Sequence, residues 1–564
     1  MRKYLGSNKL LIGLSLLFLF ISLSFILPNG DLVCKDSLCQ LSIGDWHMHD
    51  ALWHISLAKL GFGSWPLTNP FMSGSTLSGY NFLLDYILYL MMKVGLSPFT
   101  SFFKVLPIIA AITYVYSVIS YLKFKKMPKV KANIYAFFLY FASSFSYLAT
   151  LYADGKFTGS TLRGFPVISS ITPSTMFLNI QFAFSLSIVL WILMICQSNM
   201  KFLRSILLGF LYFLLFGFKF YGAIVSLVMY AMFSLWTVAN SGITKQKIFE
   251  LISVGIFSLL GLYVFYGLGT GSQFPFVYAP FALPHLFIDD PLLFYNHSLT
   301  LARYFLYENK TGFSPRLVGI ELLSIFLFVI FNFGTRILSI LYMISSTIRK
   351  NLIFEHLVFF IITIVTFLIP IFFVQSGGWY NTMQFLYYGL WFASFLTAEY
   401  CFQLYNSKSK IRYLGLMIIF LLTIPNIIDQ LRYVKAPQIT IRSNELKALE
   451  VLKAAPSGIV HINNPVHRNA YIPAIAEKVP YYLDTDQLMV THAAYENRLA
   501  FIEKYQGGSI TTVPADYFYI YKTEWGTQDA ISALSNPGFK IIYDSEEINI
   551  YQRLKAEMLQ LEHE

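Results

Sequence analysis

Side chains able to bind metal or move protons gather in one short run, residues 44–54. They are Asp45, His47, His49, Asp50 and His54. In a helix, His47, Asp50 and His54 would share one face, and Asp45 and His49 the opposite face. Either set could bind a divalent cation, because carboxylates suit Mg²⁺ or Mn²⁺ and imidazoles tolerate Mn²⁺ or Zn²⁺. An amphipathic helix lying on a membrane surface would explain the same residues without chemistry.

The elements that must position this run are mostly apolar. Of the 564 residues, 56% are apolar and 13% are charged, against about 25% charged in soluble proteins. A span needs about 20 mostly apolar residues. The candidate spans are 9–27, 98–122, 132–152, 176–198, 205–218, 222–240, 249–269, 317–333, 353–374, 384–404 and 413–428. We therefore expect a polytopic all-α membrane domain of about eleven spans over residues 1–432, whose outer loop 28–97 carries the acidic and histidine cluster.

The basic residues predict the orientation. With the N-terminus in the cytoplasm, the six inner segments hold 18 Lys and Arg, and the five outer segments, which together contain many more residues, hold 9. Such an excess is typical of cytoplasmic loops. We expect a multi-pass plasma-membrane protein that faces anionic lipid and binds no nucleic acid. In this scheme residues 81–97 form an interfacial helix, and residues 205–240 form a hairpin with Lys219 at its tip.

Residues 433–564 form a more polar tail, with 12 basic and 16 acidic residues. Its short apolar runs predict strands at 458–463, 481–483 and 517–521, and a hairpin over 539–553. Helices are expected from a cap at Ser443, over 468–478 and over 486–505. This alternation favours a partly parallel sheet with covering helices. After eleven crossings the tail would be an extracytoplasmic α/β domain.

Three spaced motifs lie in the first outer loop: Gly44-Asp45-x-x-x-His49, Pro66-x-x-Asn69-Pro70-x-x-x-Gly74 and Gly79-Tyr80-Asn81-Phe82-Leu83-Leu84-Asp85. Together they resemble the first outer loop of GT-C glycosyltransferases, multispanning enzymes that use polyprenyl-phosphate sugars. The resemblance implies that Asp45 is the catalytic or metal-associated acid. It also implies hexosyl or pentosyl transfer to an extracytoplasmic glycan, lipid or protein. The family often has two adjacent acidic residues, whereas Trp46 follows Asp45 here.

Transfer from a phosphate leaving group needs a carboxylate to deprotonate the acceptor and positive charge to hold the departing phosphate. Lys219, Arg163 and Arg303 are the candidates for that charge, and Asp154 is a candidate second acidic metal ligand. Snorkelling would explain the lysine without function, and solvent exposure would explain the arginines.

The outer turn over residues 376–384 could bind the sugar or the prenyl chain. Its rings, Trp379 and Tyr380, could stack, and the amides of Asn381 and Gln384 could bind hydroxyls. An aromatic belt at the membrane interface is the alternative interpretation.

Cys34 and Cys39 lie five positions apart in the first outer loop and could close a small disulfide in an oxidising compartment. Two unpaired thiols are the alternative. No Walker-type phosphate loop and no Gly-x-Gly-x-x-Gly follows a strand, so no nucleotide cofactor is expected.

Two other classes of function fit the sequence. The chain could be a transporter or flippase of lipid-linked sugars, although no inverted repeat is visible in it. It could also be a glycan polymerase or ligase of another membrane fold, or a scaffold. The acidic and histidine cluster at one membrane face favours a transferase.

Overall fold

The computed structural model describes residues 8–35, 38–77, 79–155, 167–169, 172–198, 202–267, 276–309, 314–432, 438–466, 470–491, 493–506, 513–522, 527–535 and 537–554. Within these ranges the side chains of 33–35, 38–39, 45–49, 432, 438–440, 505–506 and 527–530 are not described.

The chain divides into two compact units. Unit 1 comprises Met1–Ile26, Pro107–Val264 and Gln273–Ala436, and unit 2 comprises Leu27–Leu106, Phe265–Ser272 and Pro437–Glu564. The sequence suggested one division, at residue 433. In the structure, the first outer loop belongs to the same compact unit as the tail.

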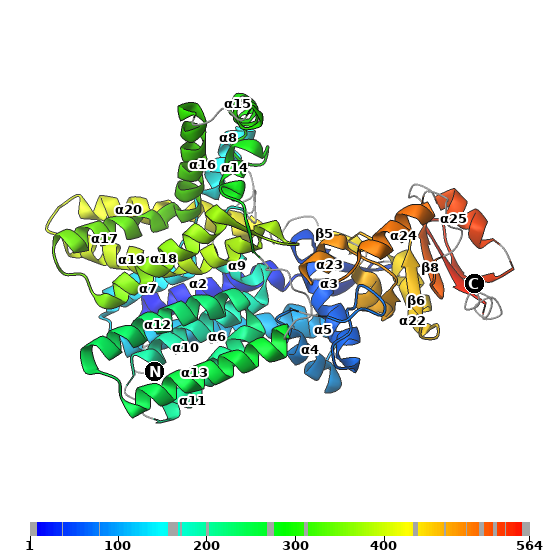
Figure 1. The fold of residues 1–564 in the computed structure, drawn as a ribbon, viewed down its shortest axis with the longest axis horizontal. Coiled ribbons are helices and arrows are strands. Elements are labelled where there is room, and N and C mark those ends of the chain that lie inside the picture. Colours follow the sequence, from blue (N-terminus) through cyan, green and yellow to red (C-terminus); the bar gives the residue numbers. More distant parts are fainter. Residues whose placement is uncertain are drawn as a thin grey trace. The chain divides into compact units, whose positions relative to one another are not determined.

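Unit 1 is a bundle of long helices (Figure 1). Seven described stretches are long and apolar enough to cross a membrane. Three of them are single helices: Lys9–Ile26 (α2), Phe220–Ser241 (α12) and Phe354–Phe372 (α18). Two consist mostly of one helix: Pro98–Phe124, which ends in α6 (Leu106–Phe124), and Lys245–Tyr266, which begins with α13 (Lys245–Gly261). The last two contain two helices each: Pro315–Ile348, with α16 (Pro315–Phe333) and α17 (Leu338–Ile348), and Arg412–Leu431, with α20 (Arg412–Leu421) and most of α21 (Ile424–Arg432). The chain is therefore a multi-pass membrane protein.

Two bent helix pairs raise the number of candidate spans to nine. They are α7 (Lys129–Phe141) with α8 (Ser146–Asp154), and α9 (Thr172–Leu178) with α10 (Ile180–Cys196). The two remaining expected spans are helices as well, α11 (Phe202–Phe218) and α19 (Met383–Asn406), but neither is among the nine. The count of eleven stays a prediction.

Helices α11 and α12 form the hairpin expected over residues 205–240. The hydroxyl of Tyr212 donates to the carbonyl of Ser226 at 2.7 Å, and Lys219 lies midway between these residues. Lys219 has an extended backbone (φ −161°, ψ 108°) and separates the two helices. The hairpin therefore places Lys219 at its tip.

Arg336 lies in a short 3-10 turn, Gly334–Ile337, between α16 and α17. Arg336 is only 3% exposed, and its guanidinium donates to the carbonyl of Ala142 at 2.6 Å. Gly334 precedes it with φ +55°, and a Cβ there would lie 2.1 Å from the carbonyl oxygen of Ser143. The long stretch thus breaks inside the bundle, where a glycine permits close approach and an arginine satisfies a carbonyl just beyond α7.

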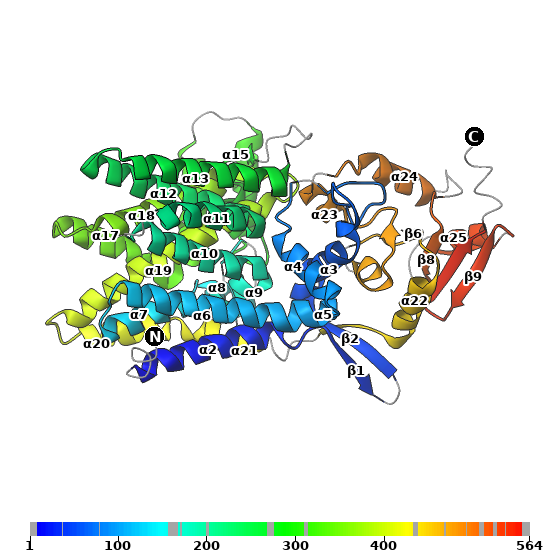
Figure 2. The same ribbon diagram turned by 90° about the horizontal axis from the view of Figure 1, so that it is seen from below.

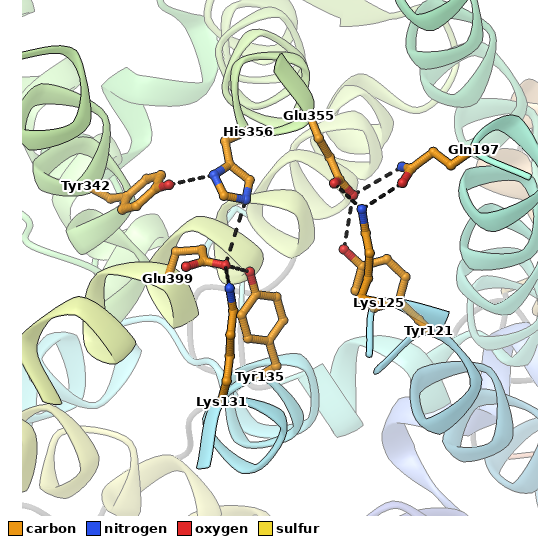
Figure 3. Close-up of polar contacts among 9 residues, drawn as sticks. All are labelled: Tyr121, Lys125, Lys131, Tyr135, Gln197, Tyr342, Glu355, His356 and Glu399. Carbon is orange, nitrogen blue, oxygen red and sulfur yellow. Dashed lines mark hydrogen bonds and ion pairs between the residues drawn. The ribbon is translucent and has the colours of Figure 1, made fainter. Parts of the chain in front are cut away.

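Nine polar residues meet near the ends of α6, α7, α10, α17, α18 and α19 (Figure 3). They are Tyr121, Lys125, Lys131, Tyr135, Gln197, Tyr342, Glu355, His356 and Glu399. Lys125 pairs with Glu355, and Lys131 pairs with Glu399. The basic-residue pattern had assigned these helix ends to one side of the membrane, and their meeting supports that grouping.

The Glu399 carboxylate gives a test of this cluster. It is 6% exposed, pairs with Lys131 and accepts a hydrogen bond from Tyr135. We expect Glu399→Gln to destabilise the protein by about 2–3 kcal/mol, because Lys131 loses its counter-charge in a mostly buried site. Thermal unfolding in detergent measures this effect. Glu308→Gln, at the exposed end of α15 (His297–Glu308), is the control, and equal melting temperatures for the two variants would contradict the prediction.

Unit 2 contains two sheets (Figure 2). In the first, β2 (Leu38–Gly44) pairs antiparallel with both β1 (Asp31–Lys35) and β5 (Gln438–Ile441). The second has the order β7-β6-β8-β10-β9. Its strands are β6 (Ile459–Ile462), β7 (Val479–Pro480), β8 (Tyr517–Tyr521), β9 (Phe539–Asp544) and β10 (Ile548–Arg553). Strands β7, β6 and β8 are parallel and β10 and β9 antiparallel, so the partly parallel sheet expected for the tail is observed.

The helices of the tail differ from the prediction in detail. The helix expected over 486–505 is two helices, α23 (Thr485–Val490) and α24 (Glu496–Gln506). Thr491 lies at the break, where its hydroxyl donates to the carbonyl of Gln487 at 2.9 Å. Helix α22 (Ser443–Ala454) begins at Ser443 with no side-chain cap, and only η8 (Ile472–Ala476) represents the helix expected over 468–478.

Candidate functional site

Helix α3 (Asp45–Leu60) carries the ionisable run. It begins at Asp45 because strand β2 ends at Gly44, whose extended backbone (φ −64°, ψ 143°) is held by a hydrogen bond to the side chain of Asn29. Residues 51–58 are all buried in unit 2. The helical conformation expected for the run is confirmed, whereas a helix that merely lies on a membrane surface does not explain this buried half.

His54 connects two carboxylates. Its Nδ1 lies 2.6 Å from Asp85 Oδ1, and its Nε2 lies 3.6 Å from Asp50 Oδ2. His54 and Asp85 are almost completely buried, whereas the side chain of Asp50 is 36% exposed. Asp85 comes from the first turn of α4 (Leu83–Lys93), and Phe102 stacks on the imidazole ring. The arrangement anchors the exposed carboxylate of Asp50 to the interior of unit 2.

The charge of His54 decides what it can bind. Burial alone would lower the pKa of His54, but the charges of Asp85 and Asp50 outweigh burial and raise the pKa to about 10. The ring is therefore an imidazolium at neutral pH, and a metal needs a deprotonated nitrogen. A metal bound through His54 would have to displace this proton. Within the described side chains, no group of three His, Cys, Asp or Glu residues could hold a metal ion.

The His54–Asp85 pair predicts how stability depends on pH. Because folding raises the pKa of His54 from about 6.5 to about 10, the pair stabilises the protein fully below pH 6.5 and less as the pH rises toward 10. We expect the melting temperature of the wild type to fall more between pH 6.5 and 9.5 than that of Asp85→Asn. The variant should already be about 3 kcal/mol less stable at pH 6.5. Parallel melting curves across this range would contradict the assignment.

Lys219 lies in a second polar region, in unit 1. Its side chain is 5% exposed, and Nζ lies 6.0 Å from the centre of the Tyr221 ring. The hydroxyl of Tyr221 donates to Gln375 at 2.6 Å, at the end of strand β4 (Phe373–Gln375). The sequence had named Lys219 and the 376–384 turn separately, and the structure connects them through Tyr221 and Gln375.

The turn after β4 presents aromatic rings. It contains η5 (Trp379–Thr382), in which Trp379 is 47% and Tyr380 39% exposed, with their rings edge to face. Gln384 donates to Asn381 at 3.0 Å, so these two amides are partly engaged with each other. Exposed rings of this kind can stack on a sugar or on a prenyl chain.

The other predicted cations and the other predicted acid have different surroundings from Lys219. Arg303 is 7% exposed and is already paired with Asp289 of α14 (Ala282–Asp289), which argues against a role as a phosphate ligand. Arg163 lies outside the described residues. Asp154 is exposed at the end of α8, in unit 1.

Cys34 and Cys39 are cross-strand neighbours in the β1–β2 hairpin, since their Cα atoms are in register. A disulfide between them is compatible with this backbone register and stays a prediction.

Sequence reasoning did not assign roles to Asp85, Tyr221 or Gln375. Asp85 carried a signal, because an aspartate inside an otherwise apolar helix has to find a partner. Gln375 follows an apolar run of about twenty residues, and Tyr221 lies two positions after Lys219. Only the fold reveals that Asp85 contacts His54, that Tyr221 lies beside Lys219, and that Gln375 binds Tyr221.

No family model matches the sequence, and no curated protein matches it. The solved structures similar to it include the archaeal oligosaccharyltransferase AglB from Archaeoglobus fulgidus, in complex with an inhibitory peptide and a dolichol-phosphate. That match has 13% identity and a TM-score of 0.49, over 99% of this chain and 75% of that chain. ArnT from Cupriavidus metallidurans, bound to undecaprenyl phosphate, matches with 10% identity and a TM-score of 0.39, over 98% of each chain.

Proposed function

We propose that this protein transfers a sugar from a polyprenyl-phosphate donor to an extracytoplasmic acceptor, with inversion at the anomeric carbon. The observation that carries the proposal is the buried Lys219 at a break between two apolar helices, connected through Tyr221 and Gln375 to the turn that holds the exposed rings of Trp379 and Tyr380. A buried cation at such a position is costly and is retained where it binds an anion. The phosphate of a lipid-linked sugar is an anion that lies at the membrane surface, where we expect the tip of this hairpin.

In the proposed reaction the acceptor hydroxyl oxygen attacks the anomeric carbon. The bond from that carbon to the phosphate oxygen breaks, and polyprenyl phosphate leaves with the electron pair. Asp45 takes the proton of the hydroxyl as general base, and Lys219 stabilises the negative charge on the leaving phosphate. Asp50, anchored by His54, orients the acceptor, and Arg163 is a candidate second cation.

Two of the metal candidates, Asp45 and His49, are four residues apart on α3 and so share a face. A Mg²⁺ or Mn²⁺ bound there would neutralise part of the phosphate charge. The base and cation roles of Asp45 and Lys219 do not depend on it.

Retention of the donor's lipid tests the proposal. We expect native mass spectrometry of the purified protein to show bound undecaprenyl phosphate at micromolar concentration, and at least tenfold weaker retention of undecaprenol, which lacks the phosphate. Equal retention of the phosphate and the alcohol would mean that only the apolar surface binds, and would contradict a phosphate site.

A further inference from the structure

The tail contains a polar cluster that the proposed reaction does not use. Strands β6 and β8 are parallel neighbours, and the chain continues from them to opposite sides of the sheet, from β6 toward β7 and from β8 toward β10 and β9. In open α/β sheets, ligands bind beyond the carboxyl ends of two strands whose connections diverge in this way.

Glu445 lies at this edge, in the first turn of α22. Its Oε1 accepts hydrogen bonds from Tyr471 and from Tyr521, the latter at 2.9 Å. Tyr521 is the last residue of β8. Within the described residues, Oε2 of Glu445 accepts no hydrogen bond. Burial raises the pKa of this carboxyl group, and the hydrogen bonds from the two tyrosine hydroxyls offset only part of that rise.

A second buried group faces the same cluster. Tyr519 is completely buried, two residues before Tyr521 on the same face of β8, and the two rings are 5.2 Å apart. Its hydroxyl makes no hydrogen bond within the described part of the chain. Asn463, just after β6, fixes the backbone of Tyr521 through two hydrogen bonds of 3.0 and 3.1 Å. The hydroxyls of Tyr471 and Tyr521 also contact each other, so the cluster is rigid, and its unused hydrogen-bonding capacity is that of Glu445 Oε2 and the Tyr519 hydroxyl.

The chemistry of this cluster selects its ligand. An open carboxylate oxygen accepts from a hydroxyl, a tyrosine hydroxyl can both donate and accept, and tyrosine rings stack on apolar faces. The carboxylate repels a phosphate, and one carboxylate is too few for a divalent cation. A neutral compound with several hydroxyl groups fits these requirements.

We propose that Glu445 and Tyr521 form a sugar-binding site at the carboxyl edge of β6 and β8. Resting on the proposed function, this site holds the acceptor, which makes the acceptor a glycan.

Saturation-transfer NMR on the full-length protein, in a detergent without a sugar head group, tests this site. The probes are glucose, galactose, mannose, rhamnose and N-acetylglucosamine. We expect at least one of them to bind the wild type, and Glu445→Ala and Tyr521→Phe each to weaken that binding at least tenfold. Glu450→Ala, at an exposed position of the same helix, should bind as the wild type does. No binding by the wild type, or equal binding by the wild type and Glu445→Ala, would overturn the proposal.

Melting temperatures separate binding from folding. Tyr521→Phe keeps the ring and removes only the hydroxyl, so a structural role alone would lower the melting temperature and leave the dissociation constant of the folded protein unchanged. That result would overturn the sugar site. Failure of the proposed transfer is distinguishable, because it appears as absent donor turnover in the wild type, whereas failure of this site leaves Asp45-dependent release of polyprenyl phosphate intact.

Discussion

Replacing Asp45 with asparagine should lower the rate of sugar transfer about a thousandfold. Asparagine has nearly the same shape but cannot take a proton, and a general base contributes about 10²–10⁴-fold to a rate. Asp45 is the first residue of α3, where asparagine is also tolerated, so folding should not change. Release of polyprenyl phosphate and the melting temperature, measured on the same preparation, separate the two effects.

Asp486→Asn is the matched control, because Asp486 is an exposed aspartate in the first turn of another helix of unit 2, α23. It should retain the activity of the wild type. Full activity in Asp45→Asn, or equal losses in the two variants, would remove Asp45 from the reaction.

Lys219→Met should lower the rate of transfer by about 10²–10³-fold, mainly because the bound donor reacts more slowly. The ammonium group stabilises charge that develops on the leaving phosphate, and one such group typically contributes that much. Methionine has a similar length and suits a buried position, so the hairpin of α11 and α12 should persist. Lys219→Arg keeps the charge and should recover part of the rate. Single-turnover kinetics with saturating donor measures both variants.

Lys245→Met controls for the removal of a lysine from unit 1, because Lys245 is exposed at the first residue of α13. Its rate should equal that of the wild type. A Lys219→Met variant that loses only stability, with an unchanged rate per folded molecule, would show that Lys219 is structural.

The sequence predicted features that depend on local patterns. Apolar runs of about twenty residues gave the spans, and the single lysine within residues 205–240 located the tip of a hairpin. Short apolar runs located β6, β8 and the β9–β10 hairpin in the tail. These signals are local because a membrane span and a buried strand each require apolar residues that are close together in the sequence.

Contacts between residues far apart in the sequence could not be predicted. The burial of Arg336 is explained by its hydrogen bond to the carbonyl of Ala142. The charge of His54 depends on Asp85, which approaches it from α4. Nothing in a single sequence indicates which carboxylate or carbonyl will lie beside a given cation, since packing between elements decides it.

The most direct test of the central claim is donor turnover by the purified wild-type protein. The protein, reconstituted in nanodiscs, is incubated with a panel of prenyl-phosphate hexoses and pentoses, and free prenyl phosphate is quantified by mass spectrometry. We predict release from at least one donor, and its loss in both Asp45→Asn and Lys219→Met. Release that persists in both variants, or no release from any donor, would contradict a transferase built on these two residues.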